Sequence, residues 1–283
     1  TRLDTRQTGT KPDTFARAAK IIHVDIDVHE LNNKIRADLP LHMDVRAFLG
    51  SINKKSGKFV RKNYSPWLDW IKQRKMKYTE DSIGNRKTIY PYHFLREVSK
   101  ILPDDAIICV DVGQNQMSVA RYFRFSSPNS LVTSGGMGTM GFGLPASIGA
   151  KIGNPGKQVV AFIGDGGFQM TIQELGTIMQ YNIGVKIVIL NNSYLGMVRQ
   201  WQDMFFGKRY ASTEMVNPDF VAIAAAYRIP ARKVSERGNL ESSVKEMLAT
   251  DGPYLLEVTI EKETNVMPMV QPGASVSEIK LTH

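Results

Sequence analysis

Asp165 and Asn192 are the residues whose types and spacing point most directly to chemistry. Asp165 sits in a glycine-rich segment, GDGG, that follows the apolar stretch 159–163, and Asn192 comes just after a second apolar stretch, 186–190. Carboxylate and amide oxygens suit Mg²⁺, which takes a few protein oxygens together with the oxygens of a phosphate. Neighbouring glycines let backbone amides approach such a phosphate closely. The pair therefore predicts a site for magnesium and a phosphate group.

A parallel sheet is the element that can bring these two residues together. The interval of 27 residues from Asp165 to Asn192 has room for one helix and one strand, so both should emerge at one sheet edge on adjacent strands. From residue 90 onward, helices alternate with continuous apolar strands, which indicates an α/β fold: a parallel sheet with helices on both faces. Such sheets bind ligands at the carboxyl ends of their strands. The expected helices cover residues 91–102, 114–122, 144–151, 172–180 and 219–227, and the expected strands cover 106–111, 131–133, 158–163, 185–190 and 254–260.

The chain divides into three parts by pattern. Residues 17–49 indicate a strand, a turn and a helix, then a second short strand and helix, which is less than a full domain. We therefore expect residues 1–50 to be the remnant of a second α/β domain, 51–89 a basic linker, and 90–283 the ligand-binding domain with a C-terminal tail. Because the chain starts at Thr1 without a Met, we interpret it as a piece of a longer protein.

Composition excludes several classes of protein. The hydrophobic fraction of 42% is ordinary for a globular protein. No apolar run is long enough for a membrane span, and no secretory signal opens the chain. The one cysteine, Cys109, lies in an apolar run and predicts a buried strand thiol in a reducing compartment, the cytoplasm or an organelle interior.

The net charge of +9 is concentrated in one stretch. Residues 51–90 contain eleven Lys or Arg and only three acids. Together with Trp67 and Trp70, this basic stretch could indicate nucleic-acid binding. We favour a connecting segment in which Trp67, Trp70 and Ile71 pack onto a neighbour, because no nucleic-acid module surrounds them.

The GDG segment, followed about two dozen residues later by Asn-Asn, resembles the signature of thiamine-diphosphate enzymes. By this resemblance, the side chains of Asp165 and Asn192 and the backbone carbonyl of Tyr194 would bind Mg²⁺. The residues that would contact the cofactor are Val112, Gly113, Gln114, Asn115, Gly138, Met140, Gly164, Gly166, Gly167 and Met197.

Longer stretches narrow the resemblance to the acetolactate synthase family, over residues 1 to about 273. They are 2–9 (RLDTRQTG), 21–27 (IIHVDID), 112–114 (VGQ), 134–141 (SGGMGTMG) and 191–202 (NNSYLGMVRQWQ). The resemblance implies catalytic roles for Met140, which would support the bent thiamine, and for Gly138, whose carbonyl would accept from the aminopyrimidine. Met197 and Trp201 would line the substrate pocket.

The same resemblance implies what the protein does. Pyruvate would be decarboxylated and joined to a second 2-ketoacid, pyruvate or 2-ketobutyrate, in branched-chain amino acid biosynthesis. FAD would bind near Arg6, Asp25 and Asp44, and the enzyme would be a homodimer or tetramer, with a regulatory subunit as a further partner. The family's ring-activating glutamate lies in a domain that this chain lacks, so we expect the isolated chain to be inactive or nearly so. We expect 193–216 and the tail after residue 265 to be mobile covers that order on cofactor binding.

Three features leave alternatives. A dinucleotide-binding fingerprint also fits Gly136, Gly138 and Gly141, and Asp165 lies 24 residues after the last of these glycines. This pattern would suit an NAD-dependent oxidoreductase. We rank it second, because Asp165 lies in its own glycine turn. The related family has His where this chain has Asn115, which can donate a hydrogen bond but carries no charge. Glu174 could be an acid or base, but the spacing Thr171-x-x-Glu174 favours a capping box.

Overall fold

Two units make up the chain in a computed structural model, which describes residues 2–60, 62–77, 87–271 and 273–281. One unit consists of Thr1–Ile83 together with Met267–His283, and the other is Gly84–Val266. In the described part of the chain, none of the helices combines the length and apolar character that a bilayer crossing requires.

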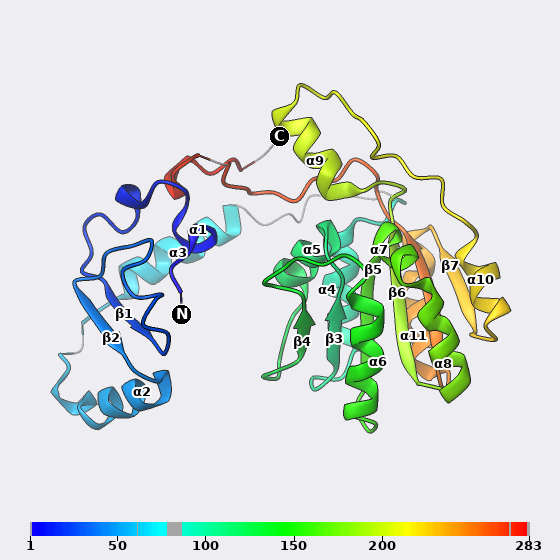
Figure 1. The fold of residues 1–283 in the computed structure, drawn as a ribbon, viewed down its shortest axis with the longest axis horizontal. Helices are drawn as coiled ribbons and strands as arrows, with labels where there is room; N and C mark the ends of the chain where they lie inside the picture. Colours follow the sequence, from blue (N-terminus) through cyan, green and yellow to red (C-terminus); the bar gives the residue numbers. More distant parts are fainter. Residues whose placement is uncertain (1, 61, 78–86, 272, 282–283) are drawn as a thin grey trace. The chain divides into compact units, whose positions relative to one another are not determined.

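A parallel six-stranded sheet forms the centre of the second unit, in the order β4-β3-β5-β6-β8-β7 (Figure 1). Every neighbouring pair is parallel, and β5 and β6 are in register from Val159 opposite Val185 to Gly164 opposite Leu190. The strands are β3 (Ile107–Val110), β4 (Leu131–Thr133), β5 (Val159–Gly164), β6 (Val185–Asn191), β7 (Ala231–Val234) and β8 (Tyr254–Thr259). The expected α/β fold class is confirmed.

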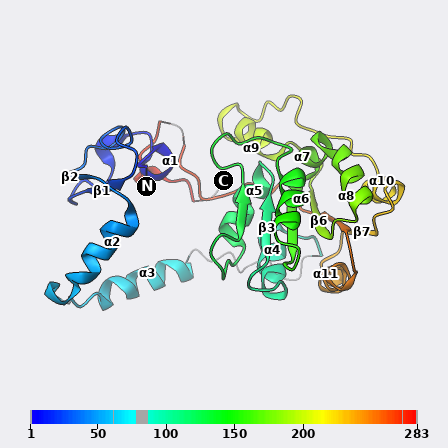
Figure 2. The same ribbon diagram turned by 60° about the horizontal axis from the view of Figure 1, so that its bottom comes forward.

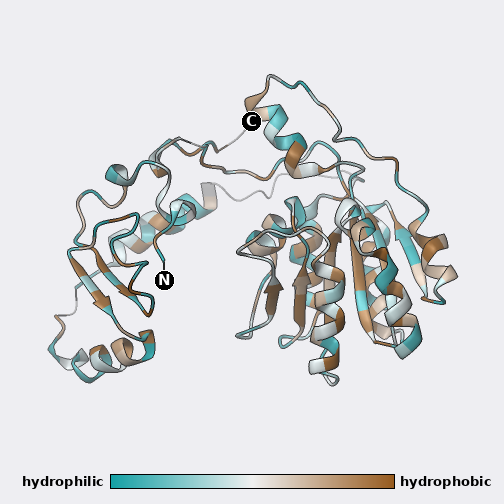
Figure 3. Ribbon diagram, viewed as in Figure 1, coloured by the Kyte–Doolittle hydropathy of each residue, from teal (hydrophilic) through white to brown (hydrophobic). Residues whose placement is uncertain are grey.

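Helices cover both faces of this sheet (Figure 2). Successive strand residues point to opposite faces, so Phe162 joins one buried cluster and Ala161 and Ile163 join the other. Figure 3 shows the strands in the middle of the sheet as mainly apolar, as expected for a sheet that is buried on both sides, whereas the edge strand β7 is partly hydrophilic. One face carries α4 (Pro91–Ile101), α5 (Gln114–Tyr122) and α11 (Leu240–Ala249), and the other carries α6 (Gly143–Gly153), α7 (Asp165–Met170), α8 (Leu175–Tyr181) and α10 (Phe220–Ala226).

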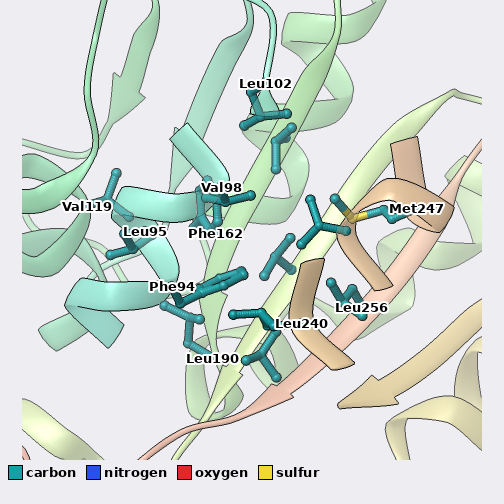
Figure 4. Close-up of a cluster of buried hydrophobic side chains, with 14 of the residues drawn as sticks. Phe94, Leu95, Val98, Leu102, Val119, Phe162, Leu190, Leu240, Met247 and Leu256 are labelled. Atoms are coloured by element: carbon teal, nitrogen blue, oxygen red, sulfur yellow. The ribbon is translucent and has the colours of Figure 1, made fainter. Parts of the chain in front are cut away.

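The first cluster shows how tightly the helices are held. Phe94 of α4 meets Phe162 of β5 edge to face, with ring centroids 6.1 Å apart, and both side chains are fully buried (Figure 4). Burying one such side chain contributes about 1.5–3 kcal/mol to stability. The tightly packed sheet therefore holds the residues at its strand ends in fixed positions.

The unit Thr1–Ile83 with Met267–His283 is built on a parallel pair of strands, β1 (Ile22–Asp25) and β2 (Leu39–His42). The helix expected between them does not form, and turns replace it. The Asp25 carboxylate accepts from the backbone amide of Asp27, and Asp27 accepts from that of His29, so side chains compete with helical bonding there. The other elements are α1 (Thr5–Thr8), η1 (Pro12–Thr14), α2 (Val45–Lys54), η2 (Ser56–Lys58), α3 (Ser65–Lys77) and η5 (Val276–Glu278).

The basic stretch contains α3, and the tail is grouped with the N-terminal residues. Residues 78–86 of the linker lie outside the described residues, and Trp67 and Trp70 stack on each other with centroids 5.0 Å apart while remaining about half exposed. The tail groups with the N-terminal residues, because the Lys11 ammonium pairs with Glu278 at 3.2 Å and the Thr10 amide donates to the Ala274 carbonyl.

Three local expectations were wrong in the sheet unit. The capping box is absent: the Thr171 hydroxyl donates to the Gly141 carbonyl at 3.0 Å, and Glu174 accepts from the Thr177 hydroxyl. The expected helix 172–180 is divided into η3 (Ile172–Glu174) and α8. The GDGG segment is no turn, because Asp165 begins α7.

Candidate functional site

The site lies where the chain direction changes across the sheet. After β3 the chain passes through α5 to β4 on one side, whereas after β5 it passes through α7 and α8 to β6 on the other side. The segments that follow β3 and β5 therefore diverge, and open parallel sheets bind ligands in the crevice at such a point. Asp111 to Gln114 follow β3, and Asp165 follows β5.

Asp165 is a buried carboxylate with its partners fixed. Asp165 is only 2% exposed. Oδ1 accepts from the Gly166 amide at 3.1 Å, and Oδ2 accepts from the Ser193 amide at 2.8 Å and from the Asn217 side-chain amide at 2.7 Å. Burial raises the pKa of Asp165 above its ordinary value, and the hydrogen bond from Asn217 is the largest opposing effect.

Asn192 is held by the same turn. Its Oδ1 accepts from the Tyr194 amide at 3.1 Å, one residue after the amide that binds Asp165. The segment 213–215 holds this turn in place, because the Leu195 amide donates to the Thr213 carbonyl at 2.8 Å. The structure therefore brings Asp165 and Asn192 together through adjacent backbone amides.

The donor set suits a magnesium ion that is shared with a phosphate. Among the described residues, no group of three His, Cys, Asp or Glu could hold a metal ion. The predicted donors, one carboxylate, one amide oxygen and the backbone carbonyl of Tyr194, are oxygens that together bring a single charge, and Mg²⁺ commonly takes further ligands from phosphate and water. The backbone at Gly166 lies close to the turn that holds Asn192, since a Cβ added at Gly166 would stand 2.8 Å from the Leu195 side chain. The residues present therefore fit the expected ion.

The expected diphosphate loop is placed at the start of α5, but its side chains are used within the protein. Gly113 precedes the helix with φ of 136°, which a side chain would disfavour. The Asn115 side-chain amide donates to the backbone carbonyls of Asp111, just after β3, at 2.9 Å and of Phe162, within β5, at 3.3 Å. Gln114 donates to Gln200 and to the Thr264 carbonyl. This arrangement gives no support for a contact between the Asn115 amide and a diphosphate, and leaves the backbone amides of α5 as donors.

Asp111 is a site residue that the sequence argument missed. It is fully buried and accepts three backbone hydrogen bonds, from Val112 at 2.7 Å, Gly141 at 3.1 Å and Gly143 at 2.8 Å. It thereby ties the loop after β3 to the glycine-rich loop before α6. Its position directly after an apolar strand was the feature of the sequence that could have identified Asp111 as a site residue.

Met140 and Gly138 lie in that glycine-rich loop. Met140 is half-buried, and Gly138 has φ of 65° and lies near Val112. The bonds of Asp111 to Gly141 and Gly143 therefore fix the loop that carries both predicted catalytic residues.

Met197 and Trp201 lie on α9 (Gly196–Phe205), a helix within the segment that was expected to be a mobile cover. Met197 is half-buried, and Trp201 is 37% exposed and contacts Phe205 with ring centroids 4.9 Å apart. The fully buried Gln200 holds the helix by bonding both the amide and the carbonyl of Val266.

The three residues expected near FAD belong to the other unit. Arg6 lies in α1, and Asp44 caps α2 by accepting from the Arg46 amide at 2.7 Å. The hydrogen bond from the Asp27 amide lowers the pKa of Asp25. Both carboxylates thus stabilise local turns and helix ends.

Comparison with known proteins identifies the family. The model of the thiamine pyrophosphate enzyme C-terminal TPP binding domain matches residues 111–258, and that of the central domain of the same enzymes matches residues 1–52. The chain belongs to the thiamine pyrophosphate enzyme family. The match to the TPP binding domain of this family runs from Asp111 into β8 and includes Asp165, Asn192 and Asn217. The NAD-dependent alternative is not favoured.

Named relatives within the thiamine pyrophosphate enzymes are acetolactate synthases. The chain is 40% identical over 279 residues to acetolactate synthase isozyme 2 large subunit of Escherichia coli (strain K12), covering 98% of this chain and 50% of that protein. It is 38% identical to a probable acetolactate synthase large subunit of Methanococcus aeolicus, over 94% of this chain and 47% of that protein. It is 37% identical to acetolactate synthase 2, chloroplastic, of Nicotiana tabacum, over 98% of this chain and 43% of that protein. The chain spans about half the length of the curated relatives it matches.

Proposed function

We propose that the chain is the C-terminal part of an acetolactate synthase catalytic subunit. The whole protein would decarboxylate pyruvate and condense the product with a second 2-ketoacid, pyruvate or 2-ketobutyrate. The observation that carries the proposal is the turn 193–194, whose amides bind the Asp165 carboxylate and the Asn192 amide oxygen. The identity to named acetolactate synthases supports the choice of reaction.

Each residue of the proposed site would have its own role. Asp165, Asn192 and the Tyr194 carbonyl would hold Mg²⁺, and the backbone amides of Gly166 and Gly167 would contact the diphosphate. When bound, thiamine diphosphate supplies the nucleophilic carbon and accepts the electron pair that decarboxylation releases. Met140 and Gly138 would orient it, and their loop is kept in place by Asp111.

α9 would form one wall of the substrate pocket. Met197 would border the site, and the large ring of Trp201 would discriminate among second ketoacids by size. Both side chains are carried on a helix that Gln200 anchors to the segment after β8, so they would be presented in a fixed orientation.

Further parts of the proposal concern the whole protein. The unit Gly84–Val266 would be the cofactor domain, and residues 1–50 part of a central domain that binds FAD near Arg6, Asp25 and Asp44. The assembly would be a homodimer or tetramer, with a regulatory subunit as a further partner, in the cytoplasm or an organelle. The isolated chain would bind cofactor but catalyse little, because it spans about half the length of the acetolactate synthases that it matches.

Calorimetry on the chain tests the proposal. Thiamine diphosphate is titrated with and without Mg²⁺ into the parent, into Asp165→Ala, and into the control Asp105→Ala, which alters an exposed carboxylate. We expect Mg²⁺-dependent binding by the parent and control, and its loss in Asp165→Ala. Binding of NADH with none of thiamine diphosphate would reverse the assignment.

A further inference from the structure

Asn217 holds the Asp165 carboxylate from a separate part of the chain. It lies two residues before the cap of α10, in a loop after the segment 213–215. Its Nδ2 donates one hydrogen to Asp165 Oδ2 at 2.7 Å and the other to Asn191 Oδ1 at 3.0 Å. Its Oδ1 accepts from Gln169 Nε2 at 2.9 Å. Both amino hydrogens and the oxygen of the Asn217 side chain are therefore engaged.

The orientation of the Asn217 amide is set first through Asn191. Asn191 Nδ2 is 2.8 Å from Glu257 Oε1, and the Lys233 ammonium is 2.8 Å from the same oxygen. Glu257 is only 2% exposed and, when ionised, can only accept hydrogen bonds. Asn191 must therefore turn its amino group to Glu257 and its oxygen to Asn217.

A second restraint acts from the opposite side through Gln169. Gln169 Nε2 lies 3.3 Å from the backbone carbonyl of Asp165, which is also only an acceptor. The Gln169 amino group thus faces both this carbonyl and Asn217 Oδ1. With acceptors at both ends of the network, Asn217 can present only its amino group to Asp165.

This restraint distinguishes the two oxygens of Asp165. Oδ2 receives two hydrogen bonds, from Ser193 and Asn217, which occupy both of its lone pairs. Among the described hydrogen bonds from other residues, Oδ1 receives one, from the amide of Gly166, so Oδ1 is the oxygen with more capacity for another partner. We propose that Asn217 is a positioning residue that fixes the Asp165 carboxylate and leaves Oδ1 to bind the cation. This inference rests on the proposed cation site and assigns a role to a residue outside its ligands.

Binding of Mn²⁺, followed by electron paramagnetic resonance in the presence of thiamine diphosphate, tests the inference on the whole chain. Partners that orient a metal ligand typically affect metal affinity by about 10–100-fold when they are lost. We expect Asn217→Ala to weaken Mn²⁺ binding by about that factor and to broaden the spectrum of the bound ion. The matched control is Asn154→Ala, which removes an exposed amide bonded only to the Ala150 carbonyl among the described contacts, and should bind as the parent does.

Unfolding of each variant without metal or cofactor separates folding from binding. If Asn217→Ala lowers the melting temperature but leaves the Mn²⁺ dissociation constant and spectrum unchanged, Asn217 only anchors its loop and the inference is overturned. If that variant does not fold, Gln169→Met replaces it, because it removes one restraint on the Asn217 amide, and a several-fold weakening is expected. Unchanged affinity in Gln169→Met would then reject the inference. A parent chain that binds no Mn²⁺ would instead reject the cation site itself.

Discussion

The backbone of Gly167 lies against the carboxyl group of Asp111, so close that a Cβ at residue 167 would stand 2.9 Å from the Asp111 Cγ. This contact joins the first turn of α7 to the end of β3. Because Asp111 also accepts from the amides of Gly141 and Gly143, one buried carboxylate sets the positions of three backbone segments around the site.

Gly167→Ala should destabilise the protein. The added methyl group overlaps a fully buried carboxylate that cannot move without losing its amide partners. Overpacking of this kind costs about 1–3 kcal/mol. Urea unfolding measures the change in the free energy of unfolding.

Gly149→Ala is the matched control for that experiment. Gly149 is an exposed residue of α6, and a Cβ there would meet nothing within 4 Å. Ala in place of Gly inside a helix should stabilise by roughly 0.5–1 kcal/mol. Equal effects of the two substitutions would contradict the close approach at residue 167.

Asp111→Asn should be destabilising although it preserves shape. An amide has only one acceptor oxygen, and its amino group would face backbone amides that are themselves donors. The loss of charge-assisted bonds and the unpaired donors should cost about 2–3 kcal/mol. Urea unfolding of this variant and of the exposed control Asp105→Asn measures the difference, and similar stability of the two would disprove the role of Asp111.

Arg199→Lys should loosen the segment that contains α9. The guanidinium lies between the rings of Tyr194 and Tyr210, at 4.7 Å and 4.5 Å from their centroids, and pairs with Glu263 at 2.7 Å. A lysine ammonium cannot stack on two rings in this way. Hydrogen exchange in residues 193–216 should become faster, whereas the control Arg209→Lys, on an exposed arginine, should leave it unchanged.

Tyr254→Phe should change how stability depends on alkaline pH. Burial, with the hydrogen bond from the Tyr254 hydroxyl to Glu246 as a second cause, raises the pKa of Tyr254 from 10.0 to about 12. The unfolded chain therefore ionises first, and the parent loses this stabilisation as pH rises from about 10 to about 12.

The measurement is unfolding by urea at pH 8, 10 and 12. The parent should be more stable than Tyr254→Phe by about 1 kcal/mol at pH 8, and the difference should shrink toward pH 12. Tyr181→Phe, at a 68% exposed position, is the control. A constant difference across this pH range would show that ionisation of Tyr254 is not coupled to folding.

The sheet was predictable because burial on both faces leaves long apolar runs. The expected helix 114–122 coincides with α5, and the central strands lie within one residue of their expected ends. β7 was missed because it is a short edge strand whose sequence, ARKV, carries two charges. The Thr171 capping box failed because a tertiary partner, the Gly141 carbonyl, takes its hydroxyl.

The site was predictable only where function leaves a local pattern. Asp165 and Asn192 each follow an apolar strand, so their meeting could be inferred from spacing. Asn217 lies 52 residues after Asp165 in an irregular loop, and no periodicity relates the two. Its role depends on the orientations of Asn191 and Gln169, which only the folded structure supplies.

The position of β8 has a consequence for how the protein is made. Among the described strands of this sheet, β8 comes last in the sequence, yet it lies between β6 and β7. Until Tyr254–Thr259 leave the ribosome, β6 has an open edge, and Asn191 lacks Glu257. The hydrogen-bond network around Asp165 can therefore be completed only after β8 has been made, well after Asp165 and Asn191 themselves.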